Sequence, residues 1–481
     1  MFERVAVPVW ALALLILFAA VTFASHFLVP SVRWFFRRRA EALVSRLNLR
    51  LARPIEPFKL ARRSDTIERL AHDPEVARAI VEHARSNGVP ESVAYETARR
   101  YAREIVPGFS ALLYFGVAAR LAMWLSRSLY RVRVSGQAEA MAAIRGDAPV
   151  VFVLNHRSNM DYVLVTWLAA RETALAYAVG EWARRWPLGS LIRAMGGYFV
   201  RRRDLNPLYR RVLARYVQIA TANGVTQAVF PEGRLTRDGA LQPPKLGILS
   251  YILADRDRGE AQEVIFVPVA LNYDRVLEDR VLIGADGPRP GGMRLRWWMP
   301  VRYLARHLQL RLTRRFARFG YAAVAYGRPL SLGAFLAEGH ADPAAALAGE
   351  LMARIDAALP VLPMALACEA LVSGARTTDA VADRIAAGAE EWRARGHVVH
   401  LGRRPVGAIA SDALGMLVAR GVVAVSDRRV AVPPEGQPLL RFYASSLPRR
   451  RQGAAPAAAE GAERIAVPNR PANGALMPIK Y

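Results

Sequence analysis

One stretch of the sequence decides the fold: Val150-Val151-Phe152-Val153-Leu154-Asn155-His156-Arg157-Ser158-Asn159-Met160-Asp161-Tyr162. Its first five residues are all apolar, which predicts a buried strand, and a polar turn follows them directly. Apolar runs recur at residues 174–179, 198–200, 225–230, 264–269 and 321–326. Helix-length stretches such as residues 207–222 lie between several of these runs. Because strands alternate with helices, the sequence predicts an α/β domain over residues 136–365, with a largely parallel sheet and flanking helices.

His156 and Asp161 occupy the turn after the first of these strands. Ligands of open α/β sheets bind just beyond the carboxyl ends of strands, and His156 lies there. If the turn folds back, the Asp161 carboxylate can hold one ring nitrogen and leave the other free to accept a proton, as a general base requires. The alternative is structural: His156 closes the turn and Asp161 interacts with the helix dipole. The pair alone leaves both interpretations equally open.

Two more predicted strands end in loops rich in arginine. Residues 225–230 lead into Glu232, Gly233, Arg234 and Arg237, and residues 198–200 lead into Arg201-Arg202-Arg203. Guanidinium groups at this edge of a sheet suit the oxygens of a phosphate or carboxylate. Each loop could instead be an ordinary solvated loop, but their repetition within one domain favours a site for an anion.

The composition limits the classes of partner. The chain has 481 residues, 67 Lys and Arg against 41 Asp and Glu, a net charge of +26 and 53% hydrophobic residues. This hydrophobic content excludes a mostly disordered basic protein. Cys368 is the single cysteine, which excludes an intrachain disulfide and a cysteine-ligated metal site. The positive charge favours phosphorylated metabolites, anionic lipid surfaces or nucleic acid as partners.

The N-terminus predicts a membrane anchor over residues 1–33. Residues 5–25 carry no charge, and a helix of this length would cross the ~30 Å hydrocarbon core of a bilayer. Arg33 and Arg37–Arg39 follow it, so the positive-inside rule predicts that the rest of the chain is cytoplasmic. A cleaved signal peptide is the alternative, but such peptides carry their charge before a shorter apolar core.

The regions on either side of the α/β domain are predicted to be mainly helical, and the last residues are predicted to be disordered. Residues 34–135 predict a helical region, in which residues 109–125 are apolar apart from Arg120. That stretch predicts a buried or interfacial helix, with a second membrane span as the alternative. Residues 366–447 predict a mainly helical, winged-helix-like region with a helix at 411–420 and a hairpin at 422–432. The Ala-, Pro- and Gly-rich residues 448–481 predict a disordered tail.

Taken together, the loops resemble the sequence blocks of the glycerolipid acyltransferase superfamily, in particular its membrane-bound bacterial glycerol-3-phosphate acyltransferase branch. The segments that carry the resemblance are, in order, His156–Tyr162 (the H-x4-D block), Gly197–Arg202, Phe230–Gly233 continued by residues 243–247, and Phe266–Val269 with Pro268 at its marker position. Four blocks in the right order form a specific pattern, whereas H-x4-D alone is a weak one. One departure is Leu235, which stands where the third block has an arginine. Arg237 matches the second arginine of that block in register, and Arg234 and Arg201 are the alternatives.

The resemblance implies an activity and roles for the matching residues. A fatty acyl group would pass from acyl-CoA or acyl-acyl carrier protein to the sn-1 hydroxyl of glycerol 3-phosphate, giving lysophosphatidate. His156 would act as the general base and Asp161 would fix its tautomer. The implied substrate-binding residues are Arg201, Glu232, Gly233, Arg234, Arg237 and Pro268. No metal and no cofactor besides the acyl donor is implied, and the implied location is the cytoplasmic side of the inner membrane, on anionic lipids.

Three other interpretations remain from the sequence. The nearest is acylation of lysophosphatidate at sn-2, since that family shares the first and third blocks. A membrane-tethered nucleic-acid-binding protein is remote, because the predicted helix at 411–420 carries only one basic residue, and so no nucleic-acid partner is expected. An inactive scaffold rests on Leu235 alone. Residues 302–318 predict a basic amphipathic helix that could lie on a membrane, receive an acidic acyl donor or be half-buried in the ordinary way.

Overall fold

The fold is described from a computed structural model of the chain. Its described residues are 53–144, 148–180, 188–201, 205–254, 263–284 and 318–449, together with 8, 10, 14–16, 38, 42 and 44–51. They contain an eight-stranded sheet with the order β1-β7-β6-β2-β5-β3-β4, in which β8 also pairs with β6. The strands are β1 (Arg131–Ser135), β2 (Val150–Leu154), β3 (Ala176–Gly180), β4 (Gly197–Val200), β5 (Gln227–Val229), β6 (Ile265–Tyr273), β7 (Tyr321–Tyr326) and β8 (Leu330–Ser331).

The sheet is mostly parallel, as predicted. β2 runs parallel to both β5 and β6, and β3 runs parallel to β4 and β5. The carboxyl ends of these five strands therefore meet at one edge. β7 was predicted as a strand but is antiparallel to β6, and it pairs in parallel with β1. β1 was not among the predicted strands, although its sequence Arg-Val-Arg-Val-Ser alternates charged and apolar residues as a half-buried strand does; its two arginines are exposed at the edge of the sheet.

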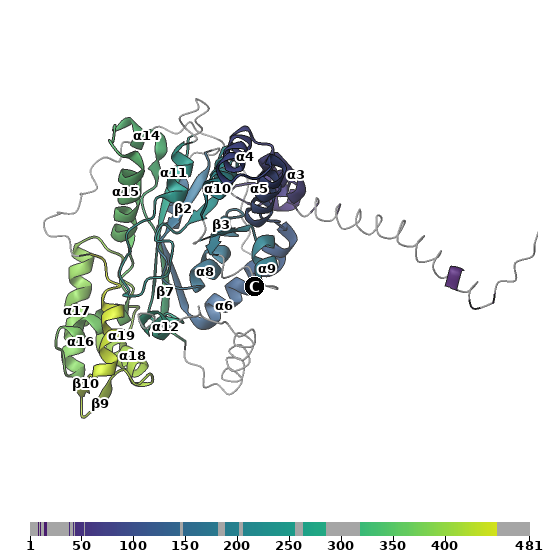
Figure 1. Ribbon diagram of the computed structural model, residues 1–481. Helices are drawn as coiled ribbons and strands as arrows, with labels where there is room; N and C mark the ends of the chain where they lie inside the picture. Colours follow the sequence, from purple (N-terminus) through teal and green to yellow (C-terminus); the bar gives the residue numbers. More distant parts are fainter. Residues whose placement is uncertain are drawn as a thin grey trace, which may run out of the picture.

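Helices cover both faces of the sheet (Figure 1). The side chains of β2 alternate between the two layers: Val151 and Val153 face one core, and Val150, Phe152 and Leu154 face the other. The first core contains α3 (Arg63–Ala71), α4 (Pro74–Asn87), α5 (Glu91–Ile105), α10 (Pro207–Ala222), α11 (Gly247–Ala254), α14 (Leu332–Ala337) and α15 (Pro343–Ala358). The second contains α6 (Ala119–Leu129), α7 (Gln137–Ala142), α8 (Met160–Ala169) and the C-terminal helices. The remaining short elements of the domain are α2 (Pro57–Leu60), α9 (Leu188–Ala194) and α12 (Asp279–Ile283).

The C-terminal region consists of helices and one hairpin. Its elements are α16 (Pro363–Val372), α17 (Thr378–Ala394), α18 (Val406–Val418), β9 (Ala424–Ser426), β10 (Arg429–Ala431), the 3₁₀-helix η5 (Pro434–Gly436) and α19 (Gln437–Ala444). Asp427 and Arg428 form the hairpin turn with positive φ angles of 46° and 62°, which is the geometry of tight hairpins. The apolar cluster of this region, which includes Trp392, is continuous with that of β2 and α8. The region therefore shares its core with the α/β domain.

Residues 109–125 form parts of two helices. A π-helix, η1 (Leu112–Ala118), leads directly into α6, and the helices are half-buried, with one face inward and one exposed. Within the part of the chain that the structure describes, no helix is both long enough and apolar enough to cross a bilayer. Nearly all of the predicted anchor, most of residues 302–318 and the tail from residue 450 lie outside the described residues.

Candidate active site

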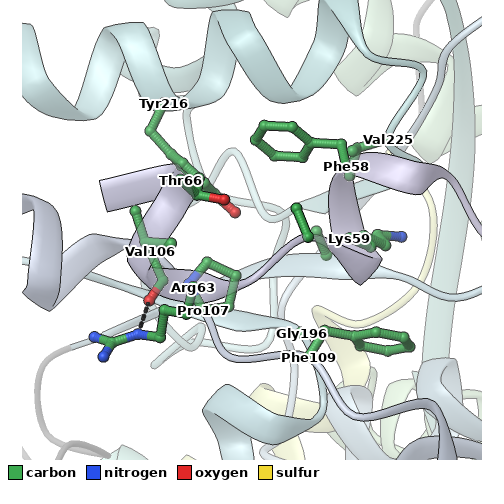
Figure 2. A pocket seen from close by; sticks show the side chains of 12 residues that line it. Phe58, Lys59, Arg63, Thr66, Val106, Pro107, Phe109, Gly196, Tyr216 and Val225 are labelled. Carbon is green, nitrogen blue, oxygen red and sulfur yellow. Dashed lines mark hydrogen bonds between the residues drawn. The ribbon is translucent and has the colours of Figure 1, made fainter. Parts of the chain in front are cut away.

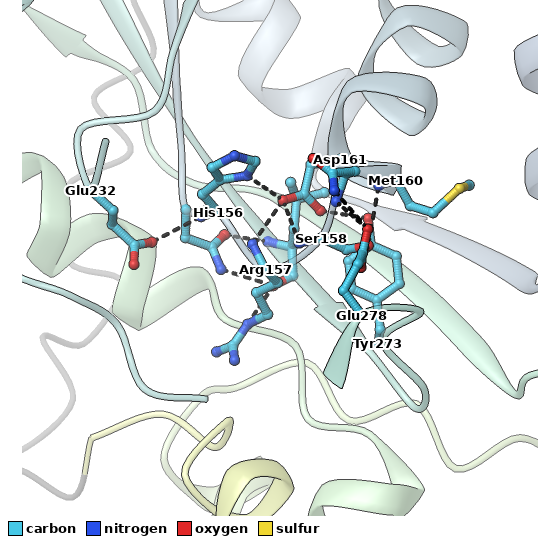
Figure 3. Close-up of polar contacts among 11 residues, drawn as sticks. His156, Arg157, Ser158, Met160, Asp161, Glu232, Tyr273 and Glu278 are labelled. Carbon is cyan, nitrogen blue, oxygen red and sulfur yellow. Dashed lines mark hydrogen bonds and ion pairs between the residues drawn. The ribbon is translucent and has the colours of Figure 1, made fainter. Parts of the chain in front are cut away.

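The turn after β2 brings His156 and Asp161 together (Figure 3). Asp161 lies in the first turn of α8, and its Oδ2 is 2.9 Å from Nδ1 of His156. The same oxygen accepts hydrogen bonds from the backbone N–H groups of Arg157 (2.7 Å) and Ser158 (3.0 Å). These bonds fold the carboxylate back over the turn, which is one of the two arrangements that the sequence left open. They leave Nε2 of His156 on the opposite edge of the ring.

A tyrosine that the sequence did not single out completes the environment of Asp161. The hydroxyl of Tyr273, at the end of β6, donates a hydrogen bond of 2.7 Å to the second carboxylate oxygen, Oδ1. Burial raises the pKa of Tyr273 well above its usual value, and the charge of Asp161 adds to this effect, so the hydroxyl stays protonated and can donate. Both oxygens of Asp161 are therefore occupied, and its side chain is fully buried.

Glu232 joins two loops and does not line the pocket beside His156. Its Oε1 accepts a hydrogen bond from the backbone N–H of His156 (2.9 Å), and its Oε2 accepts one from the N–H of Gln242 (3.0 Å). Burial raises the pKa of Glu232 to about 6, against the opposing effect of these two bonds. Gly233 follows with φ +66°, a conformation that favours glycine, and the Lys245 side chain lies close over it.

A pocket of about 250 Å³ opens beside His156 at the carboxyl edge of the sheet. The His156 ring packs against Tyr162 and Phe230, with ring-centroid distances of 5.3 and 4.5 Å, and these two rings also contact each other at 5.1 Å. The lining is mostly apolar, with residues from β3, β4, α10 and α11. Two cationic side chains also line it, Arg201 and Lys245. The pocket thus combines an apolar wall, a histidine and two positive charges.

Arg201 is held by a carboxylate that sequence reasoning missed. Glu104, a buried residue near the end of α5, accepts hydrogen bonds from Nε (2.9 Å) and Nη2 (2.7 Å) of Arg201. The guanidinium also lies over the rings of Tyr101 and Tyr209, 4.9 and 5.1 Å from their centroids. The hydrogen bonds that Arg201 donates to Glu104 raise the pKa of its guanidinium. Much of the Arg201 charge is therefore compensated within the protein.

The other expected site residues lie outside this pocket. Arg234 and Arg237 are exposed on the loop after β5, and neither lines the pocket. Pro268 lies in the middle of β6 opposite Val153 of β2, and its carbonyl accepts a hydrogen bond from Gly327. Lys245 does line the pocket, because its backbone N–H bonds to the Pro231 carbonyl at 2.8 Å. The signal for Lys245 was present in the segment 243–247, but nothing in the sequence placed it beside His156.

A smaller cavity of about 30 Å³ lies at the opposite edge of the sheet (Figure 2). It is lined by Lys59, Arg63 and residues that precede or begin β3, β4 and β5. Burial lowers the pKa of Lys59, while Glu56 at 3.4 Å raises it, and the ammonium group donates to the carbonyls of Ala174 and Thr226. This space holds about one water molecule, which excludes a substrate site.

The described residues contain no cluster of three or more His, Cys, Asp or Glu side chains arranged to hold a metal ion. A buried His–Asp pair beside an apolar, cationic pocket at the carboxyl edge of an α/β sheet is an arrangement suited to general-base chemistry. Comparison with known proteins shows which protein families the two parts of the chain resemble. Residues 131–272 match the family described as Acyltransferase, and residues 309–444 match the family described as Glycerol-3-phosphate acyltransferase C-terminal region. Together the two matches show a similarity to the glycerol-3-phosphate acyltransferase branch of the acyltransferase family.

Relatives with that name support the same branch. A glycerol-3-phosphate acyltransferase of Shewanella amazonensis is 31% identical over 319 residues, which are 65% of this chain and 37% of the relative. One of Aeromonas hydrophila subsp. hydrophila is 30% identical over 288 residues, 58% of this chain and 34% of the relative. The matched part thus spans little more than a third of these relatives. The crystal structure of the 1-acyl-sn-glycerophosphate acyltransferase PlsC from Thermotoga maritima is 19% identical and has a TM-score of 0.31, covering 54% of this chain and 79% of that chain.

The contacts of Glu232 predict the effect of replacing it by glutamine. The amide group in Glu232→Gln would turn an NH₂ donor toward one of the two backbone N–H groups, and an unsatisfied buried donor costs about 1–3 kcal/mol. If the site catalyses the acyl transfer proposed below, we expect its kcat to fall roughly tenfold, with a smaller change in the KM for the acceptor. Steady-state kinetics will measure both. Glu263→Gln is the matched control, because Glu263 lies just before the first residue of β6, away from the pocket, and its carboxylate also accepts a hydrogen bond, from the Ser331 hydroxyl. A raised KM with unchanged kcat would instead place Glu232 in contact with the substrate.

Proposed function

We propose that the protein transfers a fatty acyl group from acyl-CoA or acyl-acyl carrier protein to the sn-1 hydroxyl of glycerol 3-phosphate. The product is lysophosphatidate, in the first step of phospholipid synthesis. The observation that carries this proposal is the His156–Asp161 pair, buried at one end of an apolar pocket that also contains Arg201 and Lys245. Apolar walls suit an acyl chain, the cations suit a phosphate, and the names of the relatives agree with both.

The proposed mechanism uses His156 as a general base. Asp161 holds Nδ1 of His156, so Nε2 takes the proton of the sn-1 hydroxyl while its oxygen attacks the thioester carbonyl carbon. The carbon–sulfur bond then breaks, and the imidazolium returns the proton to the departing thiolate. No acyl-enzyme forms in this sequence. General-base assistance of this kind contributes roughly 10²–10⁴ in rate.

Lys245 is the better candidate for the main contact with the substrate phosphate. Its ammonium group lies at the pocket and makes no ion pair with any described residue, whereas Arg201 is already paired with Glu104. Arg201 would then share its charge between Glu104 and the phosphate. Arg234 and Arg237 do not line the pocket, so a contact from either would require the loop after β5 to move.

The first test replaces the general base. His156→Ala should lower acyl transfer to glycerol 3-phosphate by at least about 10²-fold, because no other described histidine lines the pocket. Radiolabelled glycerol 3-phosphate and lysophosphatidate, each with acyl-CoA and acyl-acyl carrier protein, give the acceptor and the donor in one assay. His72→Ala, an exposed histidine, is the control. Near-normal activity of His156→Ala contradicts the mechanism, and a preference for lysophosphatidate contradicts the proposed acceptor.

The second test compares the cations. Lys245→Ala should raise the KM for glycerol 3-phosphate about tenfold or more and leave the KM for the acyl donor nearly unchanged, because a charge-assisted contact to the phosphate is lost. Arg237→Ala should change the KM much less, since Arg237 lies outside the pocket. Initial rates over a range of acceptor concentrations will measure both. If Arg237→Ala has the larger effect, the pocket assignment of the phosphate is wrong.

We also infer that η1 and α6 lie on an anionic lipid surface. Leu112, Val117, Leu121 and Trp124 form an exposed apolar face along these two helices, each 41–58% exposed. No acidic residue occurs between Glu104 and Glu139, whereas the exposed Arg120 and Arg127 lie on α6 itself. Anionic headgroups fit this charge.

The position of residues 44–51 is consistent with a membrane contact through η1 and α6. Val44, Leu47 and Leu51 pack against the small cluster around Tyr114 of η1, so the chain enters the domain beside this face. An anchor at residues 5–25 would then be attached close to it, and the catalytic domain would lie on the cytoplasmic side of the inner membrane, as the positive-inside rule predicts.

A site-specific label tests the lipid face. Leu121→Cys, labelled with a polarity-sensitive fluorophore, should shift to shorter wavelength with vesicles of phosphatidylglycerol and phosphatidylethanolamine, and less with phosphatidylcholine alone. Val372→Cys, an exposed position on α16, is the matched control, and the native Cys368 is buried. An unchanged spectrum at position 121 contradicts the proposed contact.

A further inference from the structure

Residues 274–279 connect the active-site turn to the C-terminal region. They follow β6 and end at the first residue of α12. On one side, the Glu278 carboxylate accepts hydrogen bonds from the Ser158 hydroxyl (2.8 Å), the Asn159 backbone N–H (3.1 Å) and the Asn159 side-chain amide (2.9 Å). Ser158 and Asn159 lie between His156 and Asp161 in the sequence (Figure 3). Glu278 therefore holds the middle of the turn that carries the His–Asp pair.

The next residue, Asp279, is held by the C-terminal region. Its carboxylate accepts hydrogen bonds from Nη2 of Arg420 at 2.7 and 2.6 Å, and another from the hydroxyl of Tyr443. Arg420 follows α18, and Tyr443 lies on α19. The Tyr443 hydroxyl also accepts a hydrogen bond of 2.9 Å from the backbone N–H of Val276. Two adjacent carboxylates thus face opposite ways, one toward the active-site turn and one toward the C-terminal helices.

A second connection runs through Arg157, the residue after His156. Its buried guanidinium donates to the carbonyls of Leu271 (3.1 Å), Ser446 (3.3 Å) and Gly239. Ser446 belongs to the C-terminal region, just after α19. Its carbonyl also accepts a hydrogen bond of 3.2 Å from the side chain of Asn272. The residue that follows His156 is therefore held partly by a hydrogen bond to the segment just after α19.

Apolar packing alone would be enough to hold the C-terminal region against the α/β domain, so these polar contacts require another explanation. Asp279 and Tyr443 are at most 3% exposed, and burying a carboxylate and a guanidinium is costly unless their geometry is well satisfied. Apolar side chains of similar volume would hold the two regions together at least as well, whereas hydrogen-bonded pairs also fix direction. None of Glu278, Asp279, Arg420 and Tyr443 lines the pocket, so they have no contact with a substrate bound there.

We propose that the C-terminal region is a positioning element for the catalytic pair. Arg420 and Tyr443 fix Asp279, the neighbouring Glu278 fixes Ser158 and Asn159, and the turn so held presents Nε2 of His156 to the pocket. The kinetic part of this inference rests on the proposed acyl transfer. The structural part does not.

The kinetic test uses the smallest changes in the full-length chain. Tyr443→Phe and Asp279→Asn should each lower kcat roughly tenfold while the KM for glycerol 3-phosphate stays within about twofold, since they displace His156 without touching the substrate. Tyr198→Phe is the matched control: Tyr198 is also fully buried, and its hydroxyl has no hydrogen-bond partner among the described residues. Wild-type kcat in both variants would overturn the proposal.

Hydrogen exchange gives a readout that does not need activity. The backbone N–H groups of Arg157, Ser158 and Asn159 are bonded to Asp161 and Glu278, so peptides covering residues 155–161 should exchange faster in Tyr443→Phe than in Tyr198→Phe. Equal exchange in the two variants would contradict the proposed connection. If the wild type fails to acylate glycerol 3-phosphate but the exchange differs as expected, the proposed function fails and the positioning role stands. Because Tyr443→Phe removes one hydroxyl only, the test remains valid even if Asp279→Asn does not fold.

Discussion

The candidate active site depends on one buried group, the carboxylate of Asp161. A carboxylate without partners in the interior costs several kcal/mol, so the surrounding structure has to satisfy it. It accepts four hydrogen bonds, from the His156 ring, from two backbone N–H groups of the turn and from the Tyr273 hydroxyl. The conformation of the turn, the start of α8 and the end of β6 all follow from this requirement. The same bonds orient His156, which couples the stability of the turn to its chemistry.

The parallel sheet supplies the remaining parts by bringing strand ends to one edge. β2 carries His156, β5 leads to Glu232 and to the loop that holds Lys245, and β4 leads to Arg201. Glu232 bonds to the backbone N–H of His156 and so fixes the spacing between two of these loops. The pocket therefore arises from loops far apart in the sequence, at the edge where ligands bind in sheets of this kind.

The C-terminal region belongs to the same core and reaches the same turn. Its apolar residues continue the cluster around β2 and α8, and its polar residues hold Asp279 and Arg157. A region that had looked in the sequence like a separate module is thus joined to the catalytic loop by hydrogen bonds as well as by apolar contact. This arrangement gives a physical reason for the acyltransferase domain and the C-terminal region to occur in one chain.

Several local features follow directly from the sequence. The strands at 150–154 and 321–326 and the helix at 207–222 have the predicted bounds, because apolar patterning and a helix cap act over short distances. The five-residue spacing of His156 and Asp161 allowed their contact, but it left the structural alternative equally open. Three other features could be known only from the folded chain: the antiparallel direction of β7, the pairing of Arg201 with Glu104, and the presence of Lys245 at the pocket in place of Arg237. These depend on packing between segments distant in the chain, which no local pattern encodes.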